Sequence, residues 1–363
     1  MPYRQSDQVG SCVLFERSDQ SVVLIDVPRS IEEAQVLPGQ NIERRILSSS
    51  PIESPWKTPE PKKGLRQLVT TSPSAAIAEL MTLERVRSAI EVVRSSHQGL
   101  WCLPRICQQT ETNADNDDKA AGEVSRKRKQ MSTEPKVTAS NVPPFIPTRS
   151  HHILGTIDSQ RELFLGAAPN FDLVVLDPPW PSRSVRRKTN GYSTVYGVGE
   201  ARALLAQVPI AAHLKPDGLV AVWVTNKATV TDLLTSPSDG VFSLWGLELI
   251  GEWVWLKITS SGDPVIDVES QWRKPWERLL IARRRSGKTQ LPVPNRVILG
   301  VPDVHSRKPN LRSLFKGILP DDYLGLEVFA RNLTAGWWSW GNEVLHFQQS
   351  HHWVQTDHNP PEQ

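Results

Sequence analysis

Cysteine is scarce in this sequence. The 363 residues contain three, Cys12, Cys102 and Cys107, and no two of them form a C-x-x-C spacing. An odd number of cysteines without metal-ligand spacing supports neither a disulfide framework nor a structural zinc site. We expect the thiols to behave as small core or surface side chains, and we expect no metal in the functional site.

Long apolar runs and a strong charge of either sign are also absent. No stretch of about 18 uncharged apolar residues occurs, and the first ten residues lack the basic-then-apolar pattern of a secretory signal. The net charge of +3 is too small to identify a nucleic-acid partner by itself. These absences predict a soluble protein without a membrane span, located in the nucleus or also in the cytoplasm.

The N-terminal part of the chain predicts a small α+β module over residues 1–108. Residues 12–28 read as two short strands around a polar turn, and residues 48–63 are rich in proline and serine, as surface loops are. A helix is expected after Pro73, because apolar residues recur at helical spacing as far as Val93.

Two further segments are expected to lack fixed structure. Residues 109–142 are acidic and then basic, with few large apolar side chains, and predict a disordered charged linker. The basic run 126–129 within it fits a nuclear-import signal and fits a solubilising charge run equally well. Residues 350–363 are expected to form a flexible tail.

Residues 143–349 alternate between strand and helix patterns. The run "DLVVLD", which ends at Asp177, is apolar enough for a central strand buried on both faces. Helices are expected over 199–218 and 310–319. The alternation predicts an α/β fold with a mostly parallel sheet, which binds ligands at the carboxyl ends of its strands. No G-x-G loop follows a strand before Asp177, which disfavours a dinucleotide dehydrogenase.

The turn after this strand, "DPPW", carries hydrogen-bond acceptors and an aromatic ring. Pro178 and Pro179 have no N–H, so the carbonyls around them remain acceptors on a rigid turn, and an ionised Asp177 also only accepts. Acceptors held beside Trp180 suit a flat ligand with an amino group to donate, such as the edge of adenine or cytosine. Alternatively, the prolines only end the strand and Trp180 is a core ring.

Four stretches accompany this motif: "VWVTN" at 222–226, "HSRKPN" at 305–310, "LEVFARN" at 326–332 and "GWWSWGNEVLHF" at 336–347. With them, residues 143–349 resemble the adenine-N6 methyltransferases of the MT-A70 family, and in particular the branch of methyltransferase-like protein four. The resemblance implies a Rossmann-like, S-adenosylmethionine-dependent methyltransferase fold. Its motif order is permuted, so that the catalytic motif precedes the main cofactor strand.

The resemblance implies roles for individual residues. S-adenosylmethionine is the implied cofactor, and its expected contacts are Asp177, Lys308, Arg331, Asn342 and Glu343, with Ile157 added only for its position after the strand expected near residue 151. In the implied reaction, Asp177 and the Pro178 carbonyl accept the two hydrogens of the adenine amine. Pro179 keeps the turn rigid, and Trp180 stacks on the base.

The basic segment after the motif is the predicted nucleic-acid surface. It carries Arg186, Arg187 and Lys188, with Tyr192 nearby, and suits phosphate contacts and closure over a flipped base. Lys274 of "RKPWE", which resembles the family's "KPYE", is expected to face the active site. A second cluster, residues 283–285 together with Lys288, extends this surface or is simply solvated. By resemblance alone, the N-terminal module is expected to help dock RNA.

The function expected from these residues is transfer of a methyl group to the N6 amine of adenine in RNA. The branch implies a small nuclear RNA that carries 2′-O-methyladenosine as one such substrate. Three alternatives stay open: methylation of DNA adenine, methylation of a cytosine amine, and a catalytically inactive RNA-binding scaffold of the same fold. The sequence does not indicate an obligatory protein partner.

Overall fold

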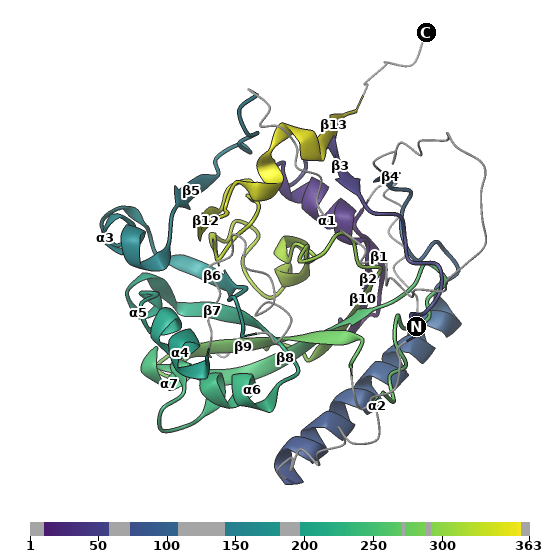
Figure 1. The fold of residues 1–363 in the computed structure, drawn as a ribbon, viewed down its shortest axis with the longest axis horizontal. Helices are drawn as coiled ribbons and strands as arrows, with labels where there is room; N and C mark the ends of the chain where they lie inside the picture. Colours follow the sequence, from purple (N-terminus) through teal and green to yellow (C-terminus); the bar gives the residue numbers. More distant parts are fainter. Residues whose placement is uncertain are drawn as a thin grey trace, which may run out of the picture.

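The computed structural model describes residues 11–57, 73–107, 142–181, 197–270, 273–287 and 292–356. Their centre is a ten-stranded sheet with the order β1-β2-β10-β8-β9-β7-β6-β11-β12-β5 (Figure 1). The strands in this order are β1 (Val13–Glu16), β2 (Val22–Ile25), β10 (Arg296–Gly300), β8 (Leu247–Lys257), β9 (Trp276–Arg284), β7 (Leu214–Val224), β6 (Phe171–Leu176), β11 (Gly325–Val328), β12 (Trp338–Gly341) and β5 (His151–Leu154). Only β1 and β9 run antiparallel to their neighbours in this sheet, so the predicted α/β fold with a mostly parallel sheet is confirmed.

Strand β6 lies between β7 and β11 and is parallel to both. Five of its six residues are buried, which explains why the run is almost entirely apolar. The strand ends at Leu176 because the prolines at 178 and 179 have no N–H to continue the ladder. The prediction of a central strand that ends at the "DPPW" turn is therefore confirmed.

Helices cover one face of the sheet. These are α2 (Pro73–Ser96), α3 (Ile157–Ala167), α4 (Val198–Ala206), α5 (Ile210–His213), α6 (Ala228–Thr235) and α7 (Val241–Leu244). The opposite face is covered by α1 (Val27–Ala34) and by the segment after β10, which includes the 3-10 turn η2 (Arg312–Phe315). Figure 1 shows α2 and α4 to α7 on one side of the sheet and α1 on the other.

Two helices differ from their expected form. The helix expected over 199–218 is split by Pro209, whose missing N–H interrupts it, and Leu214 already begins β7. The helix expected over 310–319 is a single 3-10 turn, because Gly317, two residues after its end, adopts a φ of 80° and turns the chain away.

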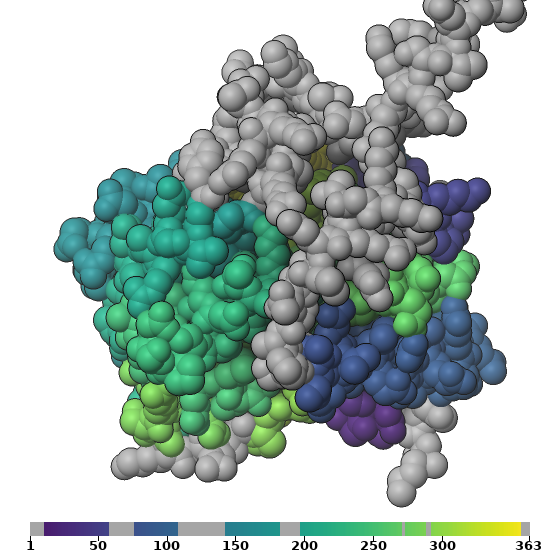
Figure 2. Space-filling model, turned by 60° about the horizontal axis from the view of Figure 1, so that its bottom comes forward, coloured from purple at the N-terminus to yellow at the C-terminus, as the bar shows by residue number. Residues whose placement is uncertain are grey.

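The N-terminal segment differs most from its expected form. In place of a separate module, β2 joins the central sheet beside β10, with Val22 opposite Val297. Helix α2 packs on the same strands through a shared apolar cluster, and Figure 2 shows it at the surface beside purple N-terminal residues. All four residues of β2 are buried, and an isolated hairpin has no second layer to bury them.

The C-terminal residues that the structure describes are also ordered. Strand β13 (Trp353–Gln355) pairs with β3 (Arg44–Ser48), which pairs with β4 (Ile106–Cys107) in a second, three-stranded sheet. Short 3-10 turns, η3 (His346–Gln348) and η4 (Ser350–His352), lead into β13. The flexible tail expected from residue 350 is therefore not seen as far as residue 356. The expected linker, up to residue 141, lies outside the described residues.

Among the described residues, no helix is both long enough and apolar enough to span a bilayer.

Candidate active site

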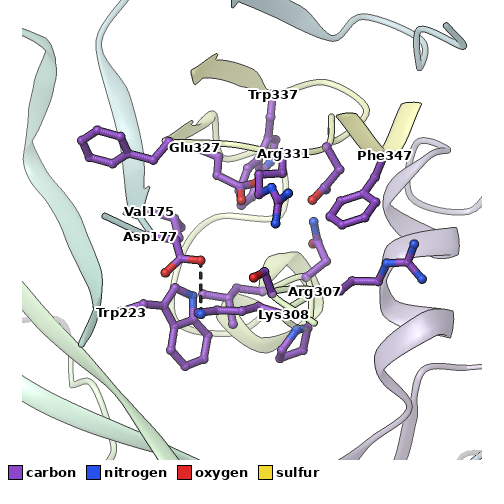
Figure 3. A pocket seen from close by; sticks show the side chains of 15 residues that line it. Val175, Asp177, Trp223, Arg307, Lys308, Glu327, Arg331, Trp337 and Phe347 are labelled. Carbon is purple, nitrogen blue, oxygen red and sulfur yellow. Dashed lines mark ion pairs between the residues drawn. The ribbon is translucent and has the colours of Figure 1, made fainter. Parts of the chain in front are cut away.

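A pocket opens at the carboxyl ends of β6, β7 and β11. Asp177 follows β6, and Glu327 lies on β11, which is the next strand in the sheet. The loop after β10 adds Lys308, and the loop after β11 adds Arg331. Figure 3 shows these four charged side chains around one cavity, with Trp223 of β7 beside the Asp177–Lys308 contact. The sheet edge thus brings together residues that are far apart in the sequence.

A chain of alternating charges crosses this edge. The Lys308 Nζ lies 3.2 Å from Asp177 Oδ2 and 3.0 Å from Glu277 Oε2, and the Lys257 Nζ lies 2.5 Å from Glu277 Oε1. Burial alone would raise the pKa of Glu277, but Lys308 and Lys257 lower it to about 2. Burial alone would likewise lower the pKa of Lys308, yet the two carboxylates hold it above its ordinary value. Glu277 is therefore ionised at neutral pH, and Lys308 is a fixed cation.

Two other carboxyl groups in the pocket have raised pKa values. Burial raises the pKa of Asp177, and Lys308 opposes the change. Burial, together with the nearby Asp177, raises the pKa of Glu327 to about 8. Glu327 lies within the "LEVFARN" stretch but was not predicted as a site residue. The local sequence does not show whether a carboxylate in a buried strand faces the pocket.

Arg331 has aromatic and acidic neighbours. Its Nε lies 3.0 Å from Glu343 Oε2, and its guanidinium carbon is 5.2 Å from the centre of the Phe347 ring. Arg307 stacks on the same ring at 4.5 Å. Asn342, directly before Glu343, is exposed after the end of β12. Three predicted cofactor residues, Arg331, Asn342 and Glu343, thus lie on two loops that meet at the pocket, although only Arg331 is part of its lining.

Ile157 is the exception among the predicted cofactor residues. It begins α3, is 2 % exposed, and packs in the apolar core beneath the helices rather than among the residues that line the pocket. Thr156 before it caps the helix, because its hydroxyl accepts a hydrogen bond from the Ser159 N–H at 3.2 Å.

Comparison with known proteins identifies the fold family. Residues 171–343 match the family model described as MT-A70. A Cryphonectria parasitica protein named "N6-methyladenosine RNA methyltransferase MTA1" is 47 % identical, over 95 % of this chain and 94 % of its own. The chain belongs to the MT-A70 family. The resemblance predicted from the motifs is therefore confirmed.

More distant relatives of this MT-A70 protein carry different names. The human protein "N(6)-adenine-specific methyltransferase METTL4" is 34 % identical, over 59 % of this chain and 45 % of its own. A Caenorhabditis elegans protein named "DNA N6-methyl methyltransferase" is 33 % identical, over 57 % of this chain and 54 % of its own. Both are similar to only part of the chain.

The "DPPW" turn of this MT-A70 protein is held by its own tryptophan. The Trp180 N–H donates to the Pro178 carbonyl at 2.8 Å, and the indole Nε1–H donates to the Trp223 carbonyl at 2.7 Å. The ring is partly buried against the core under the helices. Lys227 also donates to the Pro181 carbonyl at 2.6 Å. Instead of projecting freely, Trp180 ties the turn to the end of β7.

The predicted nucleic-acid residues have mixed outcomes. Arg186, Arg187, Lys188, Tyr192 and Lys288 lie outside the described residues. Lys274 pairs with Glu79 of α2 at 2.8 Å and is not among the residues that line the pocket.

The cluster at 283–285 lies at the other edge of the sheet. Arg283 pairs with Glu248, and Arg284 donates to the Leu214 carbonyl at the start of β7. Because β9 is antiparallel to β7, its last residues lie beside the first residues of that strand. The cluster therefore does not extend the surface around Asp177.

Proposed function

We propose that this MT-A70 protein transfers a methyl group from S-adenosylmethionine to the N6 amine of adenine in RNA. The observation that carries the proposal is the position of Asp177, which follows a central parallel strand on a double-proline turn and contacts the pocket cation Lys308 at 3.2 Å. The prediction of an adenine-N6 methyltransferase agrees with the names of its relatives, and the fungal relative that matches nearly the whole chain is named for RNA.

The charged residues of the pocket fit an S-adenosylmethionine molecule. The Lys308 ammonium and the Arg331 guanidinium are donors for a carboxylate, whereas Asp177 is an acceptor for an ammonium group. The Glu327 carboxyl, whose raised pKa keeps it mostly protonated at neutral pH, can exchange hydrogen bonds with ribose hydroxyls. Donors and acceptors in one pocket match a ligand that carries both charges. The cofactor, when bound, supplies a methyl group activated by a positively charged sulfur.

The chain itself contributes orientation. Ionised Asp177 accepts one hydrogen of the adenine amine, and the Pro178 carbonyl accepts the other with the lone pair that the Trp180 N–H leaves available. Fixing the amine in this way turns an encounter of two molecules into an oriented step, an effect worth up to roughly 7–11 kcal/mol. Because burial raises the pKa of Asp177, its carboxylate is also a better acceptor for the proton that the methylated amine loses.

The names of the relatives bear on the choice between RNA and DNA as substrate. We propose RNA over DNA, because the relative that matches nearly the whole chain is named for RNA, while the nematode protein named for DNA is similar to about half of it. A 2′-O-methyladenosine in a small nuclear RNA is the proposed site. A catalytically inactive scaffold is disfavoured because Asp177 and its contact with Lys308 are intact.

Transfer of a tritiated methyl group tests the proposal. Purified protein receives adenine-containing RNA oligonucleotides with and without 2′-O-methylation, and matched DNA. The expected result is label in N6-methyladenine of RNA, with the largest yield on the 2′-O-methylated oligonucleotide. Asp177→Ala abolishes the label, whereas Asp172→Ala, at the other end of β6 and paired with Lys215, retains it. Label on DNA alone would support the alternative substrate, and cofactor binding without any transfer would support the scaffold.

A further inference from the structure

Helix α1 carries polar side chains where a surface helix would carry apolar ones. Asp26 caps it by accepting from the Arg29 N–H at 2.9 Å, and Pro28 stands in the first turn. The helix buries Ser30 and, directly after its last turn, Gln35, which are 3 % and 4 % exposed. Buried polar groups in proteins are hydrogen-bonded, so their partners indicate what the helix holds in place.

Ser30 holds the loop that carries Lys308. Its hydroxyl accepts a hydrogen bond from the Asn310 N–H at 3.0 Å and donates to the Val27 carbonyl at 2.6 Å. The side-chain Nδ2–H of Asn310 in turn donates to the Thr334 hydroxyl at 2.8 Å. Asn310 lines the pocket two residues after Lys308, so this chain of bonds links helix, cation loop and the loop after β11.

Gln35 holds the loop that carries Arg331. The side-chain Nε2–H of Gln35 donates to the backbone carbonyl of Leu333 at 3.0 Å. The side-chain Oε1 of Gln35 accepts from the side-chain Nε2–H of Gln348 at 2.9 Å. The side-chain Oε1 of Gln348 accepts from the backbone N–H of Leu333 at 3.2 Å, which closes a ring of hydrogen bonds among the three residues. Leu333 follows Arg331 by two positions, and Gln348 follows Phe347 of the pocket.

Two hydrogen bonds to backbone carbonyls at the end of α1 reinforce both links. The Ala335 N–H donates to the Ala34 carbonyl at 2.7 Å, and Arg312 donates to the Glu33 carbonyl. The end of α1 is therefore fastened to the segments on both sides of the cavity, and Figure 3 shows the faint purple helix beside Phe347. A shift of α1 would change the separation of Lys308 and Arg331.

We propose that Ser30 and Gln35 are positioning residues for the cofactor, through which α1 sets the distance between the two pocket cations. This inference rests on the proposed function. It gives the N-terminal segment a role in positioning the loops around the cofactor pocket, where resemblance alone suggested RNA docking. Neither side chain is among the residues that line the pocket, so both act through Asn310 and Leu333.

Three variants of the full chain test the proposal. Ser30→Ala leaves the buried Asn310 N–H without its acceptor, and Gln35→Met removes the ring with Gln348 while keeping the side-chain volume. Thr82→Val is the matched control, because Thr82 is 5 % exposed and its hydroxyl donates to the Ala78 carbonyl and accepts from Arg85, both within α2.

Calorimetry without nucleic acid gives the dissociation constant of S-adenosylmethionine, and steady-state assays separate KM from kcat. We expect Ser30→Ala and Gln35→Met to raise the dissociation constant and the cofactor KM about ten-fold, because small misplacements of binding groups cost factors of this size or more. At saturating cofactor, the kcat and the KM for RNA of these two variants should stay within about two-fold of the wild-type values. Thr82→Val should change neither the dissociation constant nor the KM of the cofactor.

Three results would overturn the inference. Unchanged cofactor affinity with a lower unfolding temperature would make the two residues merely structural. A raised KM for RNA with an unchanged cofactor KM would indicate that the N-terminal segment docks RNA instead. An equal loss of cofactor affinity in Thr82→Val would show that the effect is not particular to the contacts of α1. If wild-type protein binds cofactor but methylates nothing, the proposed function fails, while the affinity comparison still decides the role of α1.

Discussion

Replacing Lys308 with methionine removes the cation at the centre of the charge chain. Its Nζ lies 3.2 Å from Asp177 and 3.0 Å from Glu277, and its side chain is 18 % exposed. At an effective dielectric constant of about 20, each contact is worth roughly 5 kcal/mol before desolvation is subtracted. Breaking a buried pair leaves an uncompensated charge and costs about 3–5 kcal/mol. We therefore expect Lys308→Met to lower the free energy of unfolding by about 3 kcal/mol at pH 8.

The pH dependence gives a second check. The folded-state pKa of Glu277, about 2, lies below its ordinary value of 4.5. Its contribution to stability is therefore present above pH 4.5 and is lost as the pH falls toward 2, and it amounts to about 3 kcal/mol. In Lys308→Met, Glu277 keeps only Lys257, and Asp177 loses its cation. The difference in unfolding free energy between the wild type and the variant should therefore shrink between pH 8 and pH 4 as these carboxylates take up protons.

Urea unfolding followed by tryptophan fluorescence measures both effects. Lys274→Met is the control, because its partner Glu79 is half exposed and such pairs contribute about 0–1 kcal/mol. A Lys308→Met deficit below about 1 kcal/mol at pH 8, or one that stays constant down to pH 4, would show that the cation does not neutralise two buried carboxylates.

Three further perturbations test the remaining parts of the site. Trp180→Phe keeps an aromatic ring but loses the bond to the Trp223 carbonyl, so kcat at saturating cofactor should fall several-fold; a wild-type kcat would mean that only the ring matters. Glu327→Gln should weaken the pH dependence of stability. The folded pKa of Glu327, about 8, lies above its ordinary value of 4.5, so its contribution is full below pH 4.5 and is lost as the pH rises through 8. The unfolding free energy of the ligand-free variant should therefore fall less over this range than that of the wild type, and an equally steep fall would contradict the assignment. Arg186→Ala combined with Arg187→Ala should weaken RNA binding and reduce the slope of log affinity against log salt by roughly 0.7 for each phosphate that is no longer neutralised, and an unchanged slope would exclude such a role for the two arginines.

The sequence predicted the parts of the site that depend on local pattern. An unbroken apolar run followed by Asp177 and two prolines specifies a buried strand and its end. Both the burial of the strand and the position of its end can be read from neighbouring residues in the sequence, without knowledge of the rest of the fold. Glu277 was missed although its motif was noticed. Lys274 precedes β9 and reaches α2, whereas Glu277 lies inside the strand and faces Lys308. Which face a strand residue occupies depends on neighbouring strands that the local sequence does not identify.

The position of the N-terminal hairpin could not be predicted for a related reason. A short run such as "VVLI" fits any sheet, and its partner β10 lies near the other end of the chain. Helix α1 was missed because it has only eight residues, and polar Ser30 and Glu32 share its buried face, so the apolar signal rests on three positions, Val27, Ile31 and Ala34.

The pairing of β2 with β10 has a consequence for biosynthesis. Val22 leaves the ribosome early, but its partner Val297 is made only after most of the chain. At about 5–20 residues per second, the apolar hairpin waits for some tens of seconds without its neighbour. During this interval it presents an unpaired strand edge, which is a template for aggregation. Successful folding of the nascent chain therefore depends on shielding its first strands until nearly the last ones appear.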